Sequence, residues 1–426
     1  MKKFLALIIA LVMALSLVAC GEQKQPDNPD VPDDGQQTAT VKVGFITLHD
    51  ENSTYDLNFI NAAKEAIANL GLTDADYILK TNVPEGQECY ETAMNLVDEG
   101  CNIIFADSFG HEPYMIDAAK EHPEVQFCHS TGTRAHTEKL ANYHNAFASI
   151  YEGRYLAGIA AGLKLNEMIE AGKFTADEAK MGYVGAFTYA EVVSGYTSFF
   201  LGARSVCPTV TMDVTFTGSW YDETLEKEGA EKLIQGGCKL ISQHADSLGA
   251  PTACENAGVP NVSYNGSTKD SCPNTFIVSS RIDWAPYYEM CIKAVMDGTE
   301  IPADWTGTLA TGSVVLTDVN ETAAAAGTAE AIAAATEKLE KGEIHVFDCA
   351  NFTTKVDDKV NTFKADYLKL DEAGHITSYM ADVDTDAAYT GDTEVIKDGY
   401  FAESEFRSAP YFDLQIDGIN LLDTKM

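Results

Sequence analysis

Short apolar segments alternate with amphipathic helical segments along this chain, and the alternation runs through twice. The first round predicts strands at 41–46, 77–79, 102–106 and 125–129, separated by helices at 58–70, 87–99 and 114–121. The second round predicts helices at 150–165, 191–204 and 224–235 among strands at 180–184, 210–215, 239–243, 259–263 and 275–279. A β-α-β-α order favours a parallel, doubly wound sheet with right-handed crossovers. Two consecutive rounds therefore predict an α/β protein with two lobes, and a body of roughly 385 residues is long enough for both.

The residues that follow the predicted strands are rich in aromatic rings, carboxylates and amides. Such segments stand at 49–58, 107–111, 218–222, 244–247, 264–266 and 281–284. In open α/β sheets ligands bind beyond the carboxyl ends of the strands, and two such edges facing each other make a cleft that closes by hinge motion. Each segment alone is better explained as a helix cap or a turn with one packing ring. Their recurrence at successive strand ends predicts a site for a small planar ligand.

The N-terminal segment predicts export and lipid attachment. Lys2 and Lys3 precede an almost unbroken apolar run from Phe4 to Ala19, which has the length of a signal-peptide core and is short for a membrane span. The run ends in LVAC at 17–20, which resembles the lipobox of bacterial lipoproteins. We therefore predict a signal peptide at 1–19 and a lipidated Cys20 that holds the protein at the outer face of the bacterial cytoplasmic membrane. The alternative is an ordinary secretory signal or a membrane anchor with a chance cysteine.

Residues 20–40 are predicted to be a disordered tether. The stretch from 21 to 38 is rich in Pro, Asp, Gln and Gly, and Val31 is its one sizeable apolar residue. It cannot bury enough apolar surface to offset the entropy of ordering. The folded body is therefore expected to begin near Val41.

Charge and cysteine content narrow the class of protein. The sequence has 65 acidic and 29 basic residues, a formal net charge of −36. Such a surface repels nucleic acid and anionic lipid headgroups, so neither is expected as a partner. Nine cysteines beyond Cys20 are scattered, without a C-x-x-C pair or metal-ligand spacing. An odd number leaves at least one thiol free; one or two disulfides stay open, and a disulfide framework or a metal site is not expected.

Several segments resemble the basic membrane protein (BMP) family of nucleoside-binding lipoproteins, which are substrate-binding components of ABC transporters. The segments are 105–110, 150–158, 201–206, 219–222, 243–247 and 284–288, and the similarity runs from about residue 41 to 348 with a weaker tail to about 418. The resemblance implies a type I periplasmic-binding-protein fold, two lobes joined by a three-strand hinge, and delivery of a small ligand to an ABC permease. The implied N-terminal lobe is 41–147 plus 280–312, and the C-terminal lobe is 148–279 plus 313–426. Binding alone needs no cofactor and no catalysis, so we do not expect an enzyme.

The resemblance also implies a purine ligand held between one aromatic ring from each lobe. Tyr55 and Trp220 would be those rings. Asp56 stands where the family has an asparagine, and a carboxylate accepts hydrogen bonds but cannot donate them. The other candidate ligand contacts are Asp107, Ser108, Phe109, Tyr221, Gln243, Asp246, Asn265, Asp283 and Trp284. Whether the ligand is a nucleoside or a bare nucleobase stays open.

The C-terminal region departs from the family. After a strand predicted at 345–348 comes an acidic segment of about 60 residues, longer than the family predicts. Its motif DVDTD at 382–386 resembles the start of a calcium loop, but the glycine and glutamate that such a loop needs are missing, which favours a solvated loop.

Two other functions were weighed against ligand delivery. An exported nucleoside or glycoside hydrolase lacks support, because the sequence has no G-x-S-x-G elbow, H-E-x-x-H helix or phosphate-binding glycine loop. The spacing of His111, His129, His136 and His144 fits neither one helix face nor a zinc finger. A sensory receptor that presents its ligand to a membrane kinase needs the same cleft and stays open as an alternative.

Overall fold

The computed structural model of the chain describes residues 40–383 and 391–426, which belong to one compact unit. The predicted signal peptide, Cys20, the tether up to residue 39 and most of the DVDTD motif lie outside the described residues. In the described part of the chain, none of the helices combines the length and the apolar character needed to cross a membrane.

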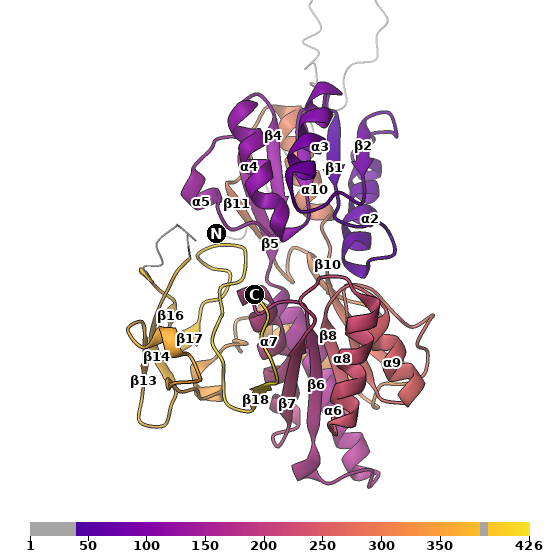
Figure 1. The fold of residues 1–426 in the computed structure, drawn as a ribbon, viewed down its shortest axis with the longest axis vertical. Coiled ribbons are helices and arrows are strands. Elements are labelled where there is room, and N and C mark those ends of the chain that lie inside the picture. The colour runs from indigo at the N-terminus through magenta and orange to yellow at the C-terminus, as the bar shows by residue number, and fades with distance from the viewer. Residues whose placement is uncertain (1–39, 384–390) are drawn as a thin grey trace, which may run out of the picture. The chain divides into compact units, whose positions relative to one another are not determined.

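The first lobe is built on a six-stranded sheet with the order β11-β5-β4-β3-β1-β2, and all its strand pairs are parallel (Figure 1). The strands are β1 (Val43–Ile46), β2 (Tyr77–Lys80), β3 (Ile103–Ala106), β4 (Gln126–Ser130), β5 (Tyr143–Ala148) and β11 (Asp304–Gly307). The helices are α2 (Thr54–Asn69), α3 (Gln87–Asp98), α4 (Glu112–Glu121), α5 (Ala135–Glu138) and α10 (Ala285–Asp297), with a 3-10 turn, η1 (Phe109–His111). Helices α2 and α10 pack on one face of the sheet, and α3 and α4 pack on the other.

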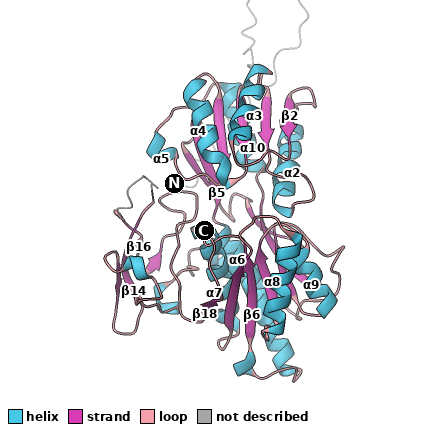
Figure 2. Cartoon of the chain, in the orientation of Figure 1, coloured by secondary structure: helices cyan, strands magenta, loops and turns pink. Residues whose placement is uncertain are grey.

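The second lobe is built on a seven-stranded sheet with the order β12-β10-β9-β8-β6-β7-β18. Its strands are β6 (Lys180–Gly185), β7 (Thr211–Phe216), β8 (Leu240–His244), β9 (Asn261–Tyr264), β10 (Phe276–Ile282), β12 (Val314–Leu316) and β18 (Ile419–Leu421). Its helices are α6 (Ile150–Glu170), α7 (Ala190–Val206), α8 (Glu223–Gln235), α9 (Gly249–Ala257) and α11 (Thr328–Glu340), with a 3-10 turn, η2 (Ala176–Glu178). The pairs of this sheet are parallel except for β12 with β10. Figure 2 shows helices flanking the strands in both lobes. The doubly wound α/β architecture predicted from the sequence is confirmed.

Helices α6 and α7 pack closely through glycine. A Cβ atom on Gly202 would lie 2.0 Å from the carbonyl oxygen of Tyr155, so only glycine lets the two backbones approach this far. The contact fixes α7, whose first turn carries Glu191 at the edge of the second sheet.

The chain passes between the two sheets three times: between β5 and α6, between β10 and α10, and between β11 and β12. Residues 280–282, which the sequence analysis placed in the N-terminal lobe, belong to β10 and pair with β9 and β12 of the second sheet. Residues 283–307 then return to the first lobe with α10 and β11.

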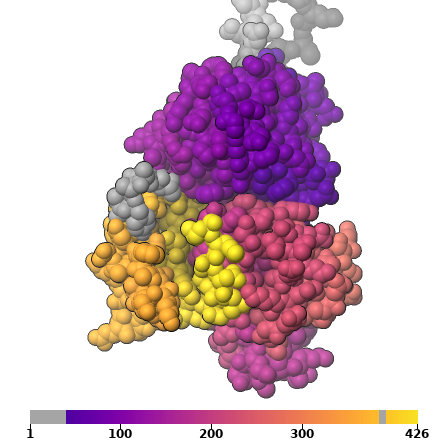
Figure 3. Space-filling view, viewed as in Figure 1, coloured from indigo at the N-terminus to yellow at the C-terminus, as the bar shows by residue number. Residues whose placement is uncertain are grey.

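The C-terminal region packs on the second lobe and completes its core. It contains β13 (Leu368–Leu370), β14 (Ile376–Ala381), β15 (Thr393–Glu394), β16 (Ile396–Lys397), β17 (Tyr400–Phe401) and the 3-10 turns η3 (Cys349–Asn351) and η4 (Thr362–Lys364). Its apolar side chains, among them Phe347, Phe352 and Phe412, join the same buried cluster as α6 and α7. Figure 3 shows the last residues, in yellow, on the surface of the second lobe.

The strand predicted at 345–348 is wrong. Only Asp348 makes a strand-like contact, an isolated bridge to Tyr400. The apolar side chains of this segment are buried because Phe347 stacks on Phe412 with ring centres 4.3 Å apart, which a sequence pattern cannot distinguish from strand pairing.

All nine described cysteines are buried free thiols, so the disulfides left open by the sequence do not form in this structure. Across residues 40–383 and 391–426, no group of three or more His, Cys, Asp or Glu side chains is placed to hold a metal ion.

Candidate functional site

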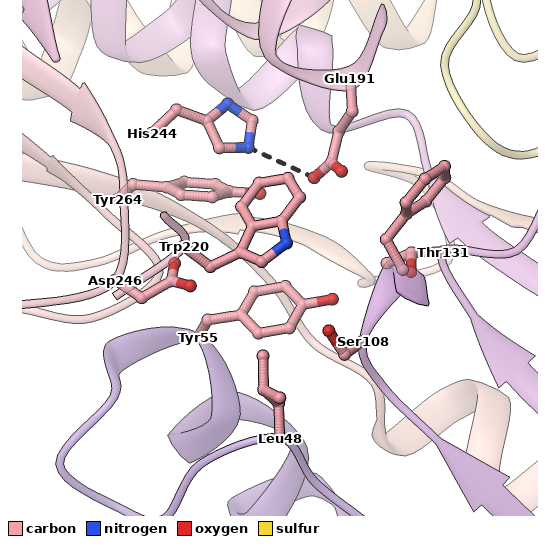
Figure 4. Close-up of a pocket in the computed structure, with 10 residues that line it drawn as sticks. Leu48, Tyr55, Ser108, Thr131, Glu191, Trp220, His244, Asp246 and Tyr264 are labelled. Atoms are coloured by element: carbon pink, nitrogen blue, oxygen red, sulfur yellow. Dashed lines mark hydrogen bonds and ion pairs between the residues drawn. The ribbon is translucent and has the colours of Figure 1, made fainter. Parts of the chain in front are cut away.

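A small cavity lies between the carboxyl edges of the two sheets, with about 340 Å³ of empty space when the part open to solvent is included (Figure 4). The first lobe contributes Leu48, Tyr55, Ser108, Phe109 and Thr131, and the second contributes Glu191, Trp220, His244, Asp246 and Tyr264. These residues stand just after β1, β3, β4, β6 and β7, or at and just after the ends of β8 and β9, as the strand-end rule requires.

Tyr55 forms the wall of the first lobe. The helix predicted at 58–70 begins earlier, at Thr54, because the Ser53 side chain caps it by accepting from the backbone N–H of Asp56. Tyr55 is therefore in the first helical turn. Its hydroxyl donates to the backbone oxygen of Asp107 at 2.7 Å, and its ring lies 4.8 Å from that of Phe59 in the core. Burial, followed by the nearby Asp107, raises the pKa of Tyr55 well above its usual value, so the hydroxyl remains a donor.

Trp220 forms the opposite wall, on the loop after β7. Its ring contacts Phe187 at 5.1 Å and Tyr189 at 6.1 Å, both on the loop between β6 and α7. Its backbone oxygen accepts from the N–H of Asp246 at 3.0 Å. In Figure 4 the side chains of Trp220 and Tyr55 both point into the cavity from opposite lobes. One aromatic ring from each lobe thus lines the cavity.

A buried polar group lies behind Trp220. His244 Nε2 is 3.3 Å from Glu191 Oε1, within hydrogen-bonding distance. Burial, assisted by the positive charge of Arg154, lowers the pKa of His244 to about 4, so the ring is neutral. Arg154 is 1% exposed; its guanidinium carbon lies 3.3 Å from the ring centre of Tyr264, and its Nη1 donates to the backbone oxygen of Gln243.

Two carboxyl groups of the site are strongly perturbed. Burial raises the pKa of Asp246 well above its usual value, and the charges of Asp56, Glu226 and Glu191 act in the same direction. Burial and Asp56 do the same for Asp107, whose Oδ1 accepts from the backbone N–H of Leu48 at 3.2 Å. The Asp246 carboxyl makes no hydrogen bond to another described residue, so it is available to a ligand.

The lobes meet around the cavity. The backbone N–H of Thr54 donates to the backbone oxygen of Asp246 at 3.0 Å, and Asn58 Nδ2 donates to Asn265 Oδ1 at 3.2 Å. Phe109 of the first lobe contacts Tyr189 of the second with ring centres 5.5 Å apart. These contacts are those of a closed cleft.

The comparisons with known proteins agree with this geometry. The family model described as ABC transporter substrate-binding protein PnrA-like (Bmp) matches residues 44–348. The chain belongs to this family. Its members are extracytoplasmic proteins that bind a small molecule and deliver it to the permease subunits of an ABC transporter, and they are binding proteins rather than enzymes. The family predicted from the sequence is confirmed.

Three curated relatives of this Bmp family member are named after different ligands. A purine-binding protein of Brucella abortus is 32% identical over 61% of this chain and 70% of its own length. A putative ABC transporter glucose-binding protein of Haloferax volcanii is 33% identical over 48% of this chain and 49% of its own length. The nucleoside-binding protein BmpA of Lactococcus lactis is 22% identical over 58% of this chain and 67% of its own.

Solved structures support the fold. An ABC transporter solute-binding protein of Aeropyrum pernix has a TM-score of 0.59 at 18% identity, covering 76% of this chain and 96% of that one. One of Conexibacter woesei has a TM-score of 0.58 at 20% identity, covering 72% and 98%. At these identities the likeness concerns the fold alone, and it confirms a fold of the periplasmic-binding-protein kind.

Five of the twelve residues predicted to contact ligand in this Bmp family member line the cavity: Tyr55, Ser108, Phe109, Trp220 and Asp246. Asp107 lies beneath it, fully buried. Asp56 is also buried, and its oxygens accept from the backbone N–H of His49 at 2.8 Å and the hydroxyl of Ser53 at 2.6 Å. The Asp56 carboxylate, which departs from the family pattern, thus accepts its hydrogen bonds within its own loop.

The other predicted residues are placed beside the cavity or away from it. Tyr221 faces His49 across the lobes, with ring centres 5.4 Å apart. Asp283 accepts from the N–H of Ala285, just before α10. Trp284 is 1% exposed and stacks on Phe59 in the core of the first lobe. Gln243 Oε1 accepts from Asn261 Nδ2, and Asn265 makes the bond to Asn58 described above.

The sequence did not single out Leu48, Thr131, Glu191, His244 or Tyr264 as ligand contacts, although His244 and Tyr264 belong to segments predicted to line the site. Successive side chains of a strand point to opposite faces; Gln243 and Asn265 were the predicted contacts, but it is their neighbours His244 and Tyr264 that line the cavity. Thr131 and Glu191 follow β4 and β6, two strand ends that were left out. The strand-end rule, applied to every predicted strand, would have indicated Thr131 and Glu191.

Proposed function

We propose that the protein captures a purine base or nucleoside between Tyr55 and Trp220 and carries it to an ABC permease. The observation that carries the proposal is the cavity itself, in which a ring from each lobe faces a carboxyl group, Asp246, that has no protein partner among the described residues. A purine offers two faces for stacking and several N–H groups at its edge. The names of the Brucella and Lactococcus relatives point in the same direction.

The polar groups of the cavity also limit the ligand. Glu191 and Asp246 are among its ten lining residues, and none of these ten is a lysine or arginine. None of the lining residues is a cation that could contact a phosphate group directly, which disfavours nucleotides. A sugar could stack on the same rings, and the name of the Haloferax relative makes glucose the competitor to test.

Thermal unfolding of residues 38–426 with purine bases, purine and pyrimidine nucleosides, glucose and amino acids tests the proposal. A ligand present at about 1,000 times its Kd stabilises the folded protein by roughly 4 kcal/mol, a shift of several degrees. We expect the shift with purines, and a clearly smaller shift in Tyr55→Ala and Trp220→Ala. A shift with glucose or amino acids alone would overturn the purine assignment. Delivery rather than sensing predicts purine uptake that depends on this protein in cells; uptake that is unchanged after its removal would favour the receptor alternative.

We further propose that Cys20 is lipidated and holds the protein at the outer face of the cytoplasmic membrane. The LVAC sequence at 17–20 supports this. Cys20→Ser should move the protein from the membrane fraction to the soluble fraction. A variant that stays in the membrane pellet would contradict a lipid anchor.

A further inference from the structure

Residues 417–425 follow the region matched by the family model, and they extend the second sheet from its β7 edge towards the cavity. Strand β18 runs parallel to β7, with Ile419 opposite Met212 and Leu421 opposite Val214. The backbone N–H of Leu422 then donates to the Val214 oxygen at 2.8 Å. Because the two strands are parallel, the segment travels towards the carboxyl edge of the sheet, where the ligand cavity lies.

Asp423 continues the pairing with its side chain. Its Oδ1 accepts from the backbone N–H of Phe216 at 2.8 Å, and its Oδ2 accepts from the Thr215 hydroxyl at 2.6 Å. Lys232 of α8 lies 3.3 Å from the same Oδ2. The last residues of β7, from which the Trp220 loop departs, are thereby held in place.

Lys425 connects two loops of the site. Its backbone N–H donates to the Thr188 hydroxyl at 2.9 Å, and the Thr188 N–H donates back to the Lys425 oxygen at 2.7 Å. On its other side, a Cβ atom on Gly218 would lie 3.5 Å from Cδ of Lys425. Thr188 stands between Phe187 and Tyr189, and Gly218 stands two residues before Trp220.

These two loops carry the aromatic wall of the second lobe. Phe187 stacks on Tyr189 with ring centres 5.0 Å apart, and both contact Trp220. Between the loops themselves, the backbone N–H groups of Thr217 and Gly218 donate to the oxygens of Gly185 and Ala186, at 2.9 Å each. Half-buried rings on loops make few other packing contacts, so the contacts of residues 423–425 should contribute to the stability of these loops.

We propose that residues 423–425 are positioning residues for the ligand site: they hold the Phe187–Tyr189 loop against the Trp220 loop, so that the Trp220 ring is already oriented when the ligand arrives. The proposal rests on the proposed function in one respect, that Trp220 contacts the ligand. Orienting the ring beforehand removes an ordering cost from binding.

Two variants of the full-length protein test it, with adenine, guanine, adenosine and guanosine as probes. Removal of residues 423–426 should weaken binding about tenfold, a scale set by loss of an ordered anchor. Thr188→Val keeps the shape of the side chain and removes one hydrogen bond to Lys425, so we expect about a fivefold loss. Thr353→Val is the matched control, because it breaks the bond from the Thr353 hydroxyl to Asp417 Oδ2 at the far end of the same segment. That control should bind like the unaltered protein.

A double-mutant cycle separates positioning from general destabilisation. In the Trp220→Ala background, removal of residues 423–426 should weaken binding by less than about twofold, because the segment acts through that ring. An undiminished loss in that background, or unchanged affinity in both single variants, would overturn the proposal.

Hydrogen exchange in the ligand-free protein keeps the two proposals distinguishable. Amides at 186–190 and 217–222 should exchange faster in the shortened chain, while those of β1 and β3 stay unchanged. Faster exchange together with no purine binding in the unaltered protein would retain the positioning role and remove the purine assignment. Unchanged exchange at these loops would remove the positioning role whatever the ligand is.

Discussion

The two walls of the cavity are built in different ways. Tyr55 belongs to the first turn of α2, and its ring continues through Phe59 to Trp284 in the core of the first lobe. Trp220 stands on a loop, packs on rings of a second loop, and depends on residues 423–425 for support. One wall is an extension of a core, and the other is an assembly of loops.

The same difference extends to the lobes. The core of the first lobe is formed by its own residues between Val41 and Ile301, with Tyr264, Ile282 and Val314 of the second sheet packed against them. The core of the second lobe also includes apolar side chains of the C-terminal region, from Val346 to Ile416. We infer that the first lobe offers a fixed surface to the ligand, while the second lobe is the one that sequence changes can most easily adapt.

The largest expected effect concerns the stability of the second lobe. Glu403 of the C-terminal region is 2% exposed, and burial raises its pKa to about 8. Between its unfolded pKa near 4.5 and this value the folded state binds the extra proton, so stability falls as the pH rises through that window and is level above it. The unaltered protein should lose on the order of 3 kcal/mol of unfolding free energy between about pH 5 and pH 8, and Glu403→Gln should show a shallower dependence on pH. Urea unfolding over this pH range measures both.

Glu226, whose pKa burial raises to about 7, remains in that variant and keeps part of the slope. Asp107 of the first lobe also has a raised pKa, so the comparison uses the difference between the two proteins: the part of the pH effect that Glu403→Gln removes should be seen in the hydrogen exchange of the second lobe. An identical slope in both proteins, or a difference located in the first sheet, would break the comparison between the lobes.

The next effect separates two tryptophans. Trp220→Ala should weaken purine binding by about 2 kcal/mol or more, because it removes an aromatic anchor, while the ligand-free protein loses less than about 1 kcal/mol of stability. Trp284→Phe should do the reverse, since Trp284 is buried in the first lobe and does not line the cavity. Calorimetric titration and chemical unfolding measure both. Equal losses of binding in the two variants would show that the walls do not differ as described.

A smaller effect tests the carboxyl group on the second wall. Burial raises the pKa of Asp246 in the empty cavity, and a ligand N–H that donates to it favours the ionised form. Binding should therefore release a proton, and affinity should increase with pH by about tenfold at most per unit until the empty-site pKa is passed. Titrations in buffers of different ionisation enthalpy report the proton. Asp246→Asn should bind without it; proton release that persists in the variant would assign it to another group.

The smallest effect concerns the hydroxyl on the first wall. Tyr55→Phe removes the hydrogen bond to the Asp107 oxygen and should cost about 1 kcal/mol of stability. The ring stays in place against Phe59, so purine affinity should change by no more than about twofold. A large loss of affinity would mean that the first wall is held by its hydroxyl rather than by the core beneath it.

Periodicity predicted the layers of the fold because each strand and helix of the α/β body is held by its own buried face. The elements at 150–165 and 239–243 were placed to within a few residues of α6 and β8. The segment at 345–348 failed because its burial comes from a ring, Phe412, that lies far along the chain. No local pattern contains that contact.

The five predicted contacts that line the cavity, among them Trp220 and Asp246, all lie in segments that follow predicted strand ends, so this part of the candidate site was predictable. The site was not predictable where it depends on which face of a strand a side chain points to, as with His244 and Gln243. A shift of one residue along a strand reverses the side that faces the cavity. The support from residues 423–425 depends on a strand pairing between residues about 200 positions apart, which no sequence motif announces.

The buried thiols make this protein convenient for watching its lobes move. Since all nine described cysteines are inaccessible in the folded state, a water-soluble maleimide should react in the body from residue 38 onward only where a surface cysteine is introduced. Lys64→Cys on α2 and Glu231→Cys on α8 replace exposed side chains, one on each lobe. A donor and an acceptor dye at these two positions would turn closure of the cleft into a fluorescence signal, one molecule at a time.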